Sequence, residues 1–153
     1  MSITEIPFQG SSMNPLFKNA SHVLVDLFEA PLAVDSRQVV PGDIILYKES
    51  RGEWICHRCL SSSAEGLLLK GDFNTSMEFK KSIFVWGVVR GFIRDEEVYE
   101  VAKPIALRWL LFAQRRQCES QTYFIKKFYR TLALFLLTLS KKVTTRKYSH
   151  RKL

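Results

Sequence analysis

The chain has 153 residues, of which 46% are hydrophobic and 25% are charged. This length is enough for one domain with a hydrophobic core and an appendage, and it excludes a large multi-domain enzyme. The formal net charge of +8 is unevenly distributed, because residues 1–103 carry a net charge of −3 and residues 104–153 carry +11. The mildly acidic first part argues against a nucleic-acid-binding domain there.

The first hundred residues contain short apolar or alternating runs that are separated by turn-forming residues. We predict strands over residues 22–27, 43–47, 54–60, 67–70, 83–93 and 98–101. Among the separators are 29–31 and 61–63, which we interpret as turns. Because no separator could hold a crossover helix, the pattern predicts a mainly β fold, with one compact antiparallel domain over residues 1–103.

A basic helical tail is predicted over residues 104–153, with helices at 105–116 and 123–140. The apolar residues of the second helix form one stripe, which comprises Phe124, Phe128, Leu132, Phe135, Leu136 and Leu139. Two interpretations stay open: the helices pack on the β domain with a solvated basic end, or they lie in the interface of an anionic membrane. The longest charge-free run, 131–140, is shorter than the roughly 20 residues that cross a bilayer. Nucleic acid is disfavoured as a partner, because nothing in the tail supplies base readout.

The cysteines and the N-terminus bear on cofactors and localisation. Cys56, Cys59 and Cys118 are expected to be reduced thiols. Cys56 and Cys59 lack the second ligand pair of a zinc site and would point to opposite faces of a strand, so we expect no metal and no cofactor. The first ten residues have neither a basic nor an apolar signal-peptide region, so we expect a cytoplasmic protein, held at most peripherally at the inner membrane face.

Serine, histidine and aspartate side chains in the β region could together hydrolyse a peptide bond. Ser12 follows a Gly-Ser pair, His57 lies within a predicted strand, and Asp72 follows a glycine. A serine nucleophile needs a base to take its proton, and a histidine base needs a carboxylate that sets its tautomer. Each residue alone is typical of a turn or a structural site, but the set is chemically complete.

Five short segments, taken in chain order, resemble the motifs of type I signal peptidases, which share a fold and a catalytic serine with the self-cleaving SOS repressors. The segments are Ser-Met-Asn-Pro at 12–15, Pro-Gly-Asp-Ile-Ile at 41–45, His-Arg at 57–58, Lys-Gly-Asp-Phe-Asn at 70–74 and Trp-Gly-Val-Val at 86–89. The His-Arg pair is similar to that of archaeal and endoplasmic-reticulum members, where bacterial members carry Lys-Arg. The resemblance covers roughly residues 8–92.

The resemblance implies roles for the matching residues. Ser12 would be the nucleophile, His57 the general base, and Asp72 the carboxylate that orients it. Lys70 is the alternative base, because burial can lower the pKa of a lysine. Arg58, next to the histidine on a strand, is expected to face the other side and to be structural.

The loop around the nucleophile departs from the family in one respect. Gly10, Ser11 and Met13 flank Ser12, and Gly10 stands where family members often have a serine whose hydroxyl helps the oxyanion hole. The backbone N–H of Ser12 remains available as a donor, and Gly10 permits a close approach of the chain.

A missing amino-terminal anchor is a second departure, and it argues against removal of signal peptides from exported proteins. We therefore expect a serine endopeptidase that cleaves a leader or signal-like segment of a precursor peptide or protein. The competing hypothesis is a non-catalytic binding or adaptor module that uses the basic tail to bind a membrane or a partner.

Overall fold

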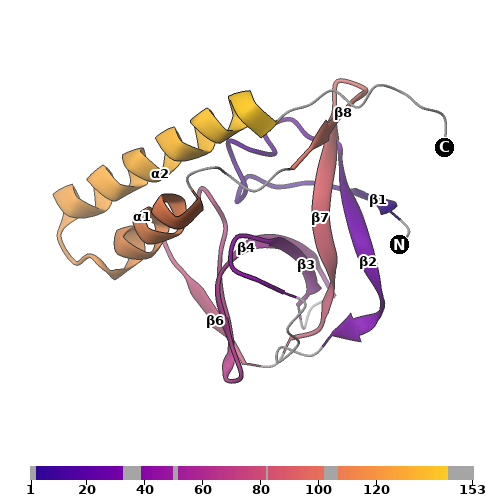
Figure 1. Ribbon diagram of the computed structural model, residues 1–153, viewed down its shortest axis with the longest axis horizontal. Helices are drawn as coiled ribbons and strands as arrows, with labels where there is room; N and C mark the ends of the chain where they lie inside the picture. Colours follow the sequence, from indigo (N-terminus) through magenta and orange to yellow (C-terminus); the bar gives the residue numbers. More distant parts are fainter. Residues whose placement is uncertain (1–2, 33–38, 50–51, 82, 102–106, 145–153) are drawn as a thin grey trace.

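The structure, a computed structural model, describes residues 3–32, 39–49, 52–81, 83–101 and 107–144, with the side chains described as far as residue 138 (Figure 1). The strands are β1 (Ile3–Pro7), β2 (His22–Leu32), β3 (Ile44–Lys48), β4 (Trp54–Ser63), β5 (Gly66–Lys70), β6 (Glu78–Lys80), β7 (Val85–Arg94) and β8 (Glu97–Glu100). They form one antiparallel sheet in the order β1-β2-β7-β3-β4-β5-β6, with β8 paired to β7. The prediction of a mainly antiparallel β fold with a helical extension is confirmed.

The sheet has a hydrophobic core on each of its faces. The first core includes Leu46 and Cys56, and the second includes Ile45 and Cys59. Neighbouring residues of a strand point to opposite faces, so β3 and β4 supply side chains to both cores. The two cysteines therefore lie on opposite faces, as expected.

Two strands were not predicted, and two predicted turns were wrong. β1 and β6 are short edge strands whose residues are mostly partly or fully exposed, so they lack an apolar run. β2 continues through residues 29–31 to Leu32, and β4 continues through 61–63. Pro31 is tolerated because the pairing of β2 with β7 is irregular between Leu27 and Leu32, and a proline cannot donate to a regular ladder.

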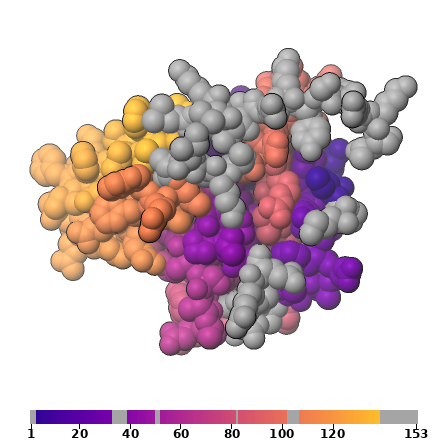
Figure 2. All heavy atoms as spheres, in the orientation of Figure 1, coloured from indigo at the N-terminus to yellow at the C-terminus, as the bar shows by residue number. Residues whose placement is uncertain are grey.

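The helices α1 (Leu107–Glu119) and α2 (Tyr123–Thr144) lie side by side and form one lobe beside the β domain (Figures 1 and 2). Leu110 and Ala113 of α1 pack against Ala133 and Leu137 of α2. The predicted boundary at residue 103 lies outside the described residues. Within the described part of the chain, neither helix combines the length and apolar character needed to cross a membrane.

α1 attaches this lobe to the β domain. A Cβ atom at Gly42 would come within 2.7 Å of the Leu107 side chain, so the helix begins in close contact with the β3 side of the sheet. Nearly three turns further along, the amide of Gln117 donates a hydrogen bond to the carbonyl of Asn74 at 3.3 Å. Packing on the β domain, one of the two interpretations of the tail, is therefore seen for α1.

Candidate active site

The loop that carries Ser12 consists of consecutive turns between β1 and β2. Met13 is fully buried in the first core, which anchors the loop, whereas Ser11 is exposed and Ser12 is half-buried. The carbonyl of Ser11 accepts a hydrogen bond from the N–H of Asn14 at 3.0 Å. Gly10 has a φ of 142°, a conformation that favours glycine. The local chain thus places the nucleophile candidate at the surface of the core.

Ser12 is held against the segment that follows β5. Its carbonyl oxygen accepts a hydrogen bond from the N–H of Phe73 at 2.8 Å. A Cβ atom at Gly71 would lie 2.7 Å from this oxygen and 2.8 Å from the Cβ of Ser12. Glycine is therefore required at position 71 for this approach, because real side chains do not make such contacts.

The pairing of β4 with β5 bears on the distance between Gly71 and His57. Arg58 on β4 pairs with Lys70 on β5, and the register continued by one residue places Gly71 opposite His57. Side chains of directly opposite residues share a face, and their Cβ atoms are about 5 Å apart. The Ser12 loop therefore reaches the end of β5, one residue beyond the Arg58–Lys70 pair, and among the described residues no hydrogen bond joins Ser12 to His57.

The imidazole of His57 is buried and has two polar neighbours at Nδ1. The hydroxyl of Tyr47 lies 3.2 Å from Nδ1, and a carboxylate oxygen of Glu78 lies 3.7 Å from it. Burial lowers the pKa of His57, and the charge of Glu78 partly opposes this effect. The ring is therefore neutral at neutral pH, which is the form that a general base requires.

Tyr47 lies near both the histidine and the carboxylate. Burial, together with the nearby charge of Glu78, raises the pKa of Tyr47. A protonated hydroxyl that donates to Glu78 leaves its oxygen free to accept the Nδ1 proton of His57. A general base needs this tautomer, with Nε2 unprotonated.

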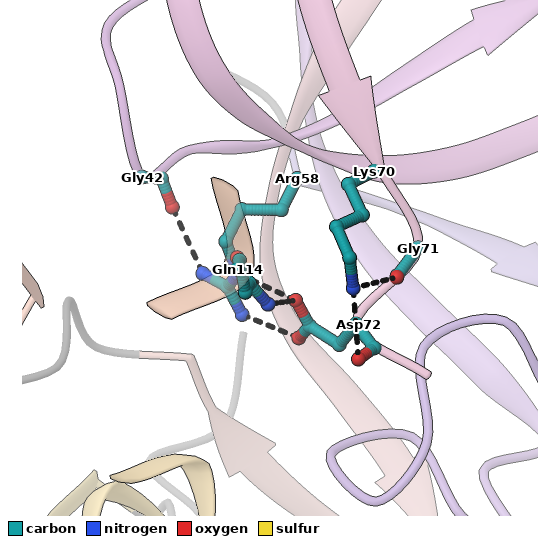
Figure 3. A network of polar contacts seen from close by, with 6 residues as sticks. All are labelled: Gly42, Arg58, Lys70, Gly71, Asp72 and Gln114. Carbon is teal, nitrogen blue, oxygen red and sulfur yellow. Dashed lines mark hydrogen bonds and ion pairs between the residues drawn. The ribbon is translucent and has the colours of Figure 1, made fainter. Parts of the chain in front are cut away.

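Asp72, which we predicted to orient His57, has other partners (Figure 3). Its carboxylate accepts two hydrogen bonds from Arg58, at 2.8 and 2.7 Å, and one from the Gln114 amide at 2.8 Å. Within the described residues, no hydrogen bond joins Asp72 to His57. The reason is strand alternation, because Arg58 and His57 are adjacent and point to opposite faces of β4.

Arg58 occupies the structural position that we expected for it. It is buried and donates a further hydrogen bond to the carbonyl of Gly42 at 3.0 Å. Together with Gln114 on α1, this network ties the β3 side of the sheet, the loop after β5 and the helical lobe to one another. Asp72 is at the centre of that network, so its position is that of a structural residue.

Lys70, the alternative base, is fully buried on the Arg58 side of the sheet. Its ammonium donates hydrogen bonds to the carbonyls of Gly71 at 3.1 Å and Asp72 at 3.4 Å. Burial lowers the pKa of Lys70, with the charge of Asp72 opposing. Because Lys70 pairs with Arg58, its side chain leaves the strand on the face opposite to His57. The ammonium of Lys70 is therefore engaged by two backbone carbonyls.

Glu78 is the residue that the sequence interpretation missed. It lies on β6 and pairs with Leu69 on β5, which places it on the same face as His57. A run of three residues has too few alternations to be predicted as a strand. One feature of the sequence could have indicated this strand. The turn-rich segment after Lys70 is short enough for a hairpin that pairs residue 78 with β5.

The cysteines lie among apolar side chains. Burial raises the pKa of the thiols of Cys56 and Cys59 to about 12, so neither is a reactive thiolate at neutral pH. Over the residues that the structure describes, no group of three His, Cys, Asp or Glu side chains could hold a metal ion.

Comparisons with known proteins give no family for this chain. No family model, no curated protein and no solved structure matches it. The functional argument therefore depends on the geometry of the site.

Proposed function

We propose that the chain is a serine endopeptidase of the signal-peptidase-like type, with Ser12 as nucleophile and His57 as general base. The observation that carries the proposal is the close approach of Ser12 to Gly71, next to the pair of Arg58 and Lys70, together with Tyr47 and Glu78 near Nδ1 of His57. In this proposal Glu78 takes the role that the sequence assigned to Asp72.

The proposed reaction has two stages. The Ser12 oxygen attacks the carbonyl carbon of the scissile bond, and its proton passes to Nε2 of His57. The imidazolium then protonates the leaving amine as the C–N bond breaks, which leaves an ester on Ser12. In the second stage His57 takes a proton from water, the hydroxide attacks the ester, and Ser12 regains its proton as it leaves.

Two further features support this chemistry. The backbone N–H of Ser12 can donate to the oxyanion that forms on the carbonyl oxygen. The charge of Glu78 and the Tyr47 hydroxyl stabilise the imidazolium that forms during each transfer, because both are near Nδ1. The substrate we propose is an extended segment of a precursor peptide or protein, bound beside a strand edge, on the cytoplasmic side of a membrane.

Labelling with a fluorophosphonate probe tests the proposal without knowledge of the substrate, because the probe reacts with activated serines. We expect covalent modification at Ser12 in the full chain, confirmed by peptide mass, and none in Ser12→Ala. The matched control is Ser11→Ala, which removes an exposed hydroxyl one residue away and should label as the parent does. No labelling of the folded parent chain, or labelling that survives Ser12→Ala, would favour a non-catalytic binding module.

A further inference from the structure

The helical lobe exposes an unusual amount of apolar side chain. Of the thirteen large hydrophobic residues that are exposed among the described residues, seven lie in the two helices. They are Trp109, Phe112, Tyr123, Phe124, Ile125, Phe128 and Phe135. Single exposed apolar residues are ordinary, but a group of this size marks a surface that binds something.

α2 is apolar on two opposite sides. Ala133 and Leu137 are buried against α1. Phe124, Phe128 and Phe135 lie within about 40° of one another around the helix axis, on the opposite side. Their exposed fractions are 80%, 63% and 57%. A helix that faces water carries polar residues on that side, so this face is suited to an apolar environment.

The aromatic surface continues from α2 onto α1. The rings of Phe128 and Tyr129 have centroids 5.4 Å apart, and Tyr129 contacts Phe112 at 5.9 Å. Phe112 in turn contacts Trp109 at 6.2 Å. We call these residues, with Phe124 and Phe135, the aromatic surface. It is one continuous feature of the lobe.

The charges around the aromatic surface are basic. Arg108 and Arg115 are exposed on α1, within about 60° of Phe112 around the helix axis. Residues 104–153 contain 12 basic residues and 1 acidic residue, and that residue, Glu119, lies 3.7 Å from Arg116. Apolar rings flanked by arginines fit an anionic, partly apolar surface. The interface of an anionic bilayer has both properties.

We propose that the two helices dock on an anionic membrane surface, with the aromatic surface at the boundary of headgroups and acyl chains and the arginines among the headgroups. The helices would lie on the membrane, because neither is, over its described residues, long and apolar enough to cross it. Gln114 and Gln117 tie α1 to the β domain, so docking would hold that domain at the membrane. This inference does not depend on peptidase activity.

Vesicle co-sedimentation of the full chain tests the proposal. We expect binding to phosphatidylcholine vesicles that contain about 30% phosphatidylglycerol, at least tenfold weaker binding to pure phosphatidylcholine, and release as salt rises and screens the charges. The variant Phe124→Ser/Phe128→Ser should lower the partition coefficient at least tenfold. The control Phe84→Ser removes a ring with the same exposed fraction as Phe128, 63%, from the β domain, and should bind as the parent does.

A second pair of variants tests the charges. Arg108→Gln/Arg115→Gln should weaken binding to anionic vesicles and reduce its dependence on salt. Lys18→Gln/Lys81→Gln removes two exposed charges from the β domain and should change neither. The circular dichroism spectrum of each variant should match that of the parent, which separates binding from folding.

Three results would overturn the proposal. The first is no binding of the parent chain to anionic vesicles, and the second is equal binding by the Phe124/Phe128 variant and the Phe84 control. The third is a combination of findings: the parent chain does not bind vesicles, it sediments as a dimer without lipid, and Phe124→Ser/Phe128→Ser abolishes that dimer. That result would assign the aromatic surface to a second copy of the chain.

Discussion

Replacing Glu78 with glutamine tests which carboxylate serves the histidine. The substitution keeps the shape of the side chain and removes the charge that lies 3.7 Å from Nδ1 of His57. At this distance two unit charges interact by about 4 kcal/mol at an effective dielectric constant of about 20, and by about 1 kcal/mol in water. One third of the Glu78 side chain is exposed. We therefore expect a loss of roughly 1.4 to 2.8 kcal/mol of imidazolium stabilisation, which is about tenfold to a hundredfold in rate.

The assay is the second-order rate constant for labelling of Ser12 by a fluorophosphonate, measured on folded protein. Glu78 also contacts Lys80, at 3.1 Å, so a control must separate that ion pair from the effect on His57. Glu49→Gln provides it, because Glu49 contacts Lys80 at 2.7 Å and its charge affects the pKa of His57 less than that of Glu78 does. Its rate constant should stay within about threefold of the parent.

The competing variant is Asp72→Asn. If Asp72 oriented the histidine, its loss would cost up to about 10⁴ in rate, as loss of the orienting carboxylate does in serine proteases. From its contacts with Arg58 and Gln114 we expect lower stability and nearly unchanged labelling at temperatures where the variant is folded. A hundredfold loss in folded Asp72→Asn, with Glu78→Gln unaffected, would refute the assignment.

Four other predictions follow from the same geometry. Gly71→Ala should slow labelling of Ser12 at least tenfold, since the added methyl would lie 2.7 Å from the Ser12 carbonyl; an unchanged rate would mean that the loop contact is dispensable. The labelling rate should rise with pH through a transition below the usual histidine value of about 6.5, because burial lowers the pKa of His57 and the neutral ring is the active form; a transition near the lysine range would favour Lys70. Because its pKa is lowered, His57 leaves the folded state fully stable above about pH 6.5 and destabilises it as pH falls below that value. Thermal melts of His57→Gln should show a weaker dependence of stability on pH. Asp72→Ala should lower the free energy of unfolding by about 3–5 kcal/mol in urea titrations, because it leaves Arg58 buried without its partner, and a loss under 1 kcal/mol would contradict the structural role.

Much of the β domain could be predicted from local pattern alone. Short apolar or alternating runs marked six of the eight strands, and all of these except β8 contain buried residues. Alternation also placed His57 and Arg58 on opposite faces, and Cys56 and Cys59 likewise. These are properties of a single strand, so the sequence of that strand contains them.

The helical tail could be predicted as helix but not in its packing. The apolar stripe left open whether the helix packs on the β domain or lies at a membrane interface. In the structure Ala133 and Leu137 make the contact with α1, while Phe124, Phe128 and Phe135 face outward. Small and large apolar residues give the same periodicity in the sequence of a helix. Whether the face of Ala133 or the face of Phe128 packs against α1 depends on how closely the two helices approach each other.

The sequence alone determined the candidate nucleophile and base, since Ser12 and His57 stand out by their local motifs, but it could not determine the carboxylate. Asp72 and Glu78 are both acidic residues after β5, and only their pairing distinguishes them. The hairpin of β5 and β6 sets residue 78 opposite Leu69 and turns it towards His57, whereas Arg58 and α1 draw Asp72 to the other face. Such register depends on the turn between strands and on packing between distant segments, so it exists only in the tertiary structure.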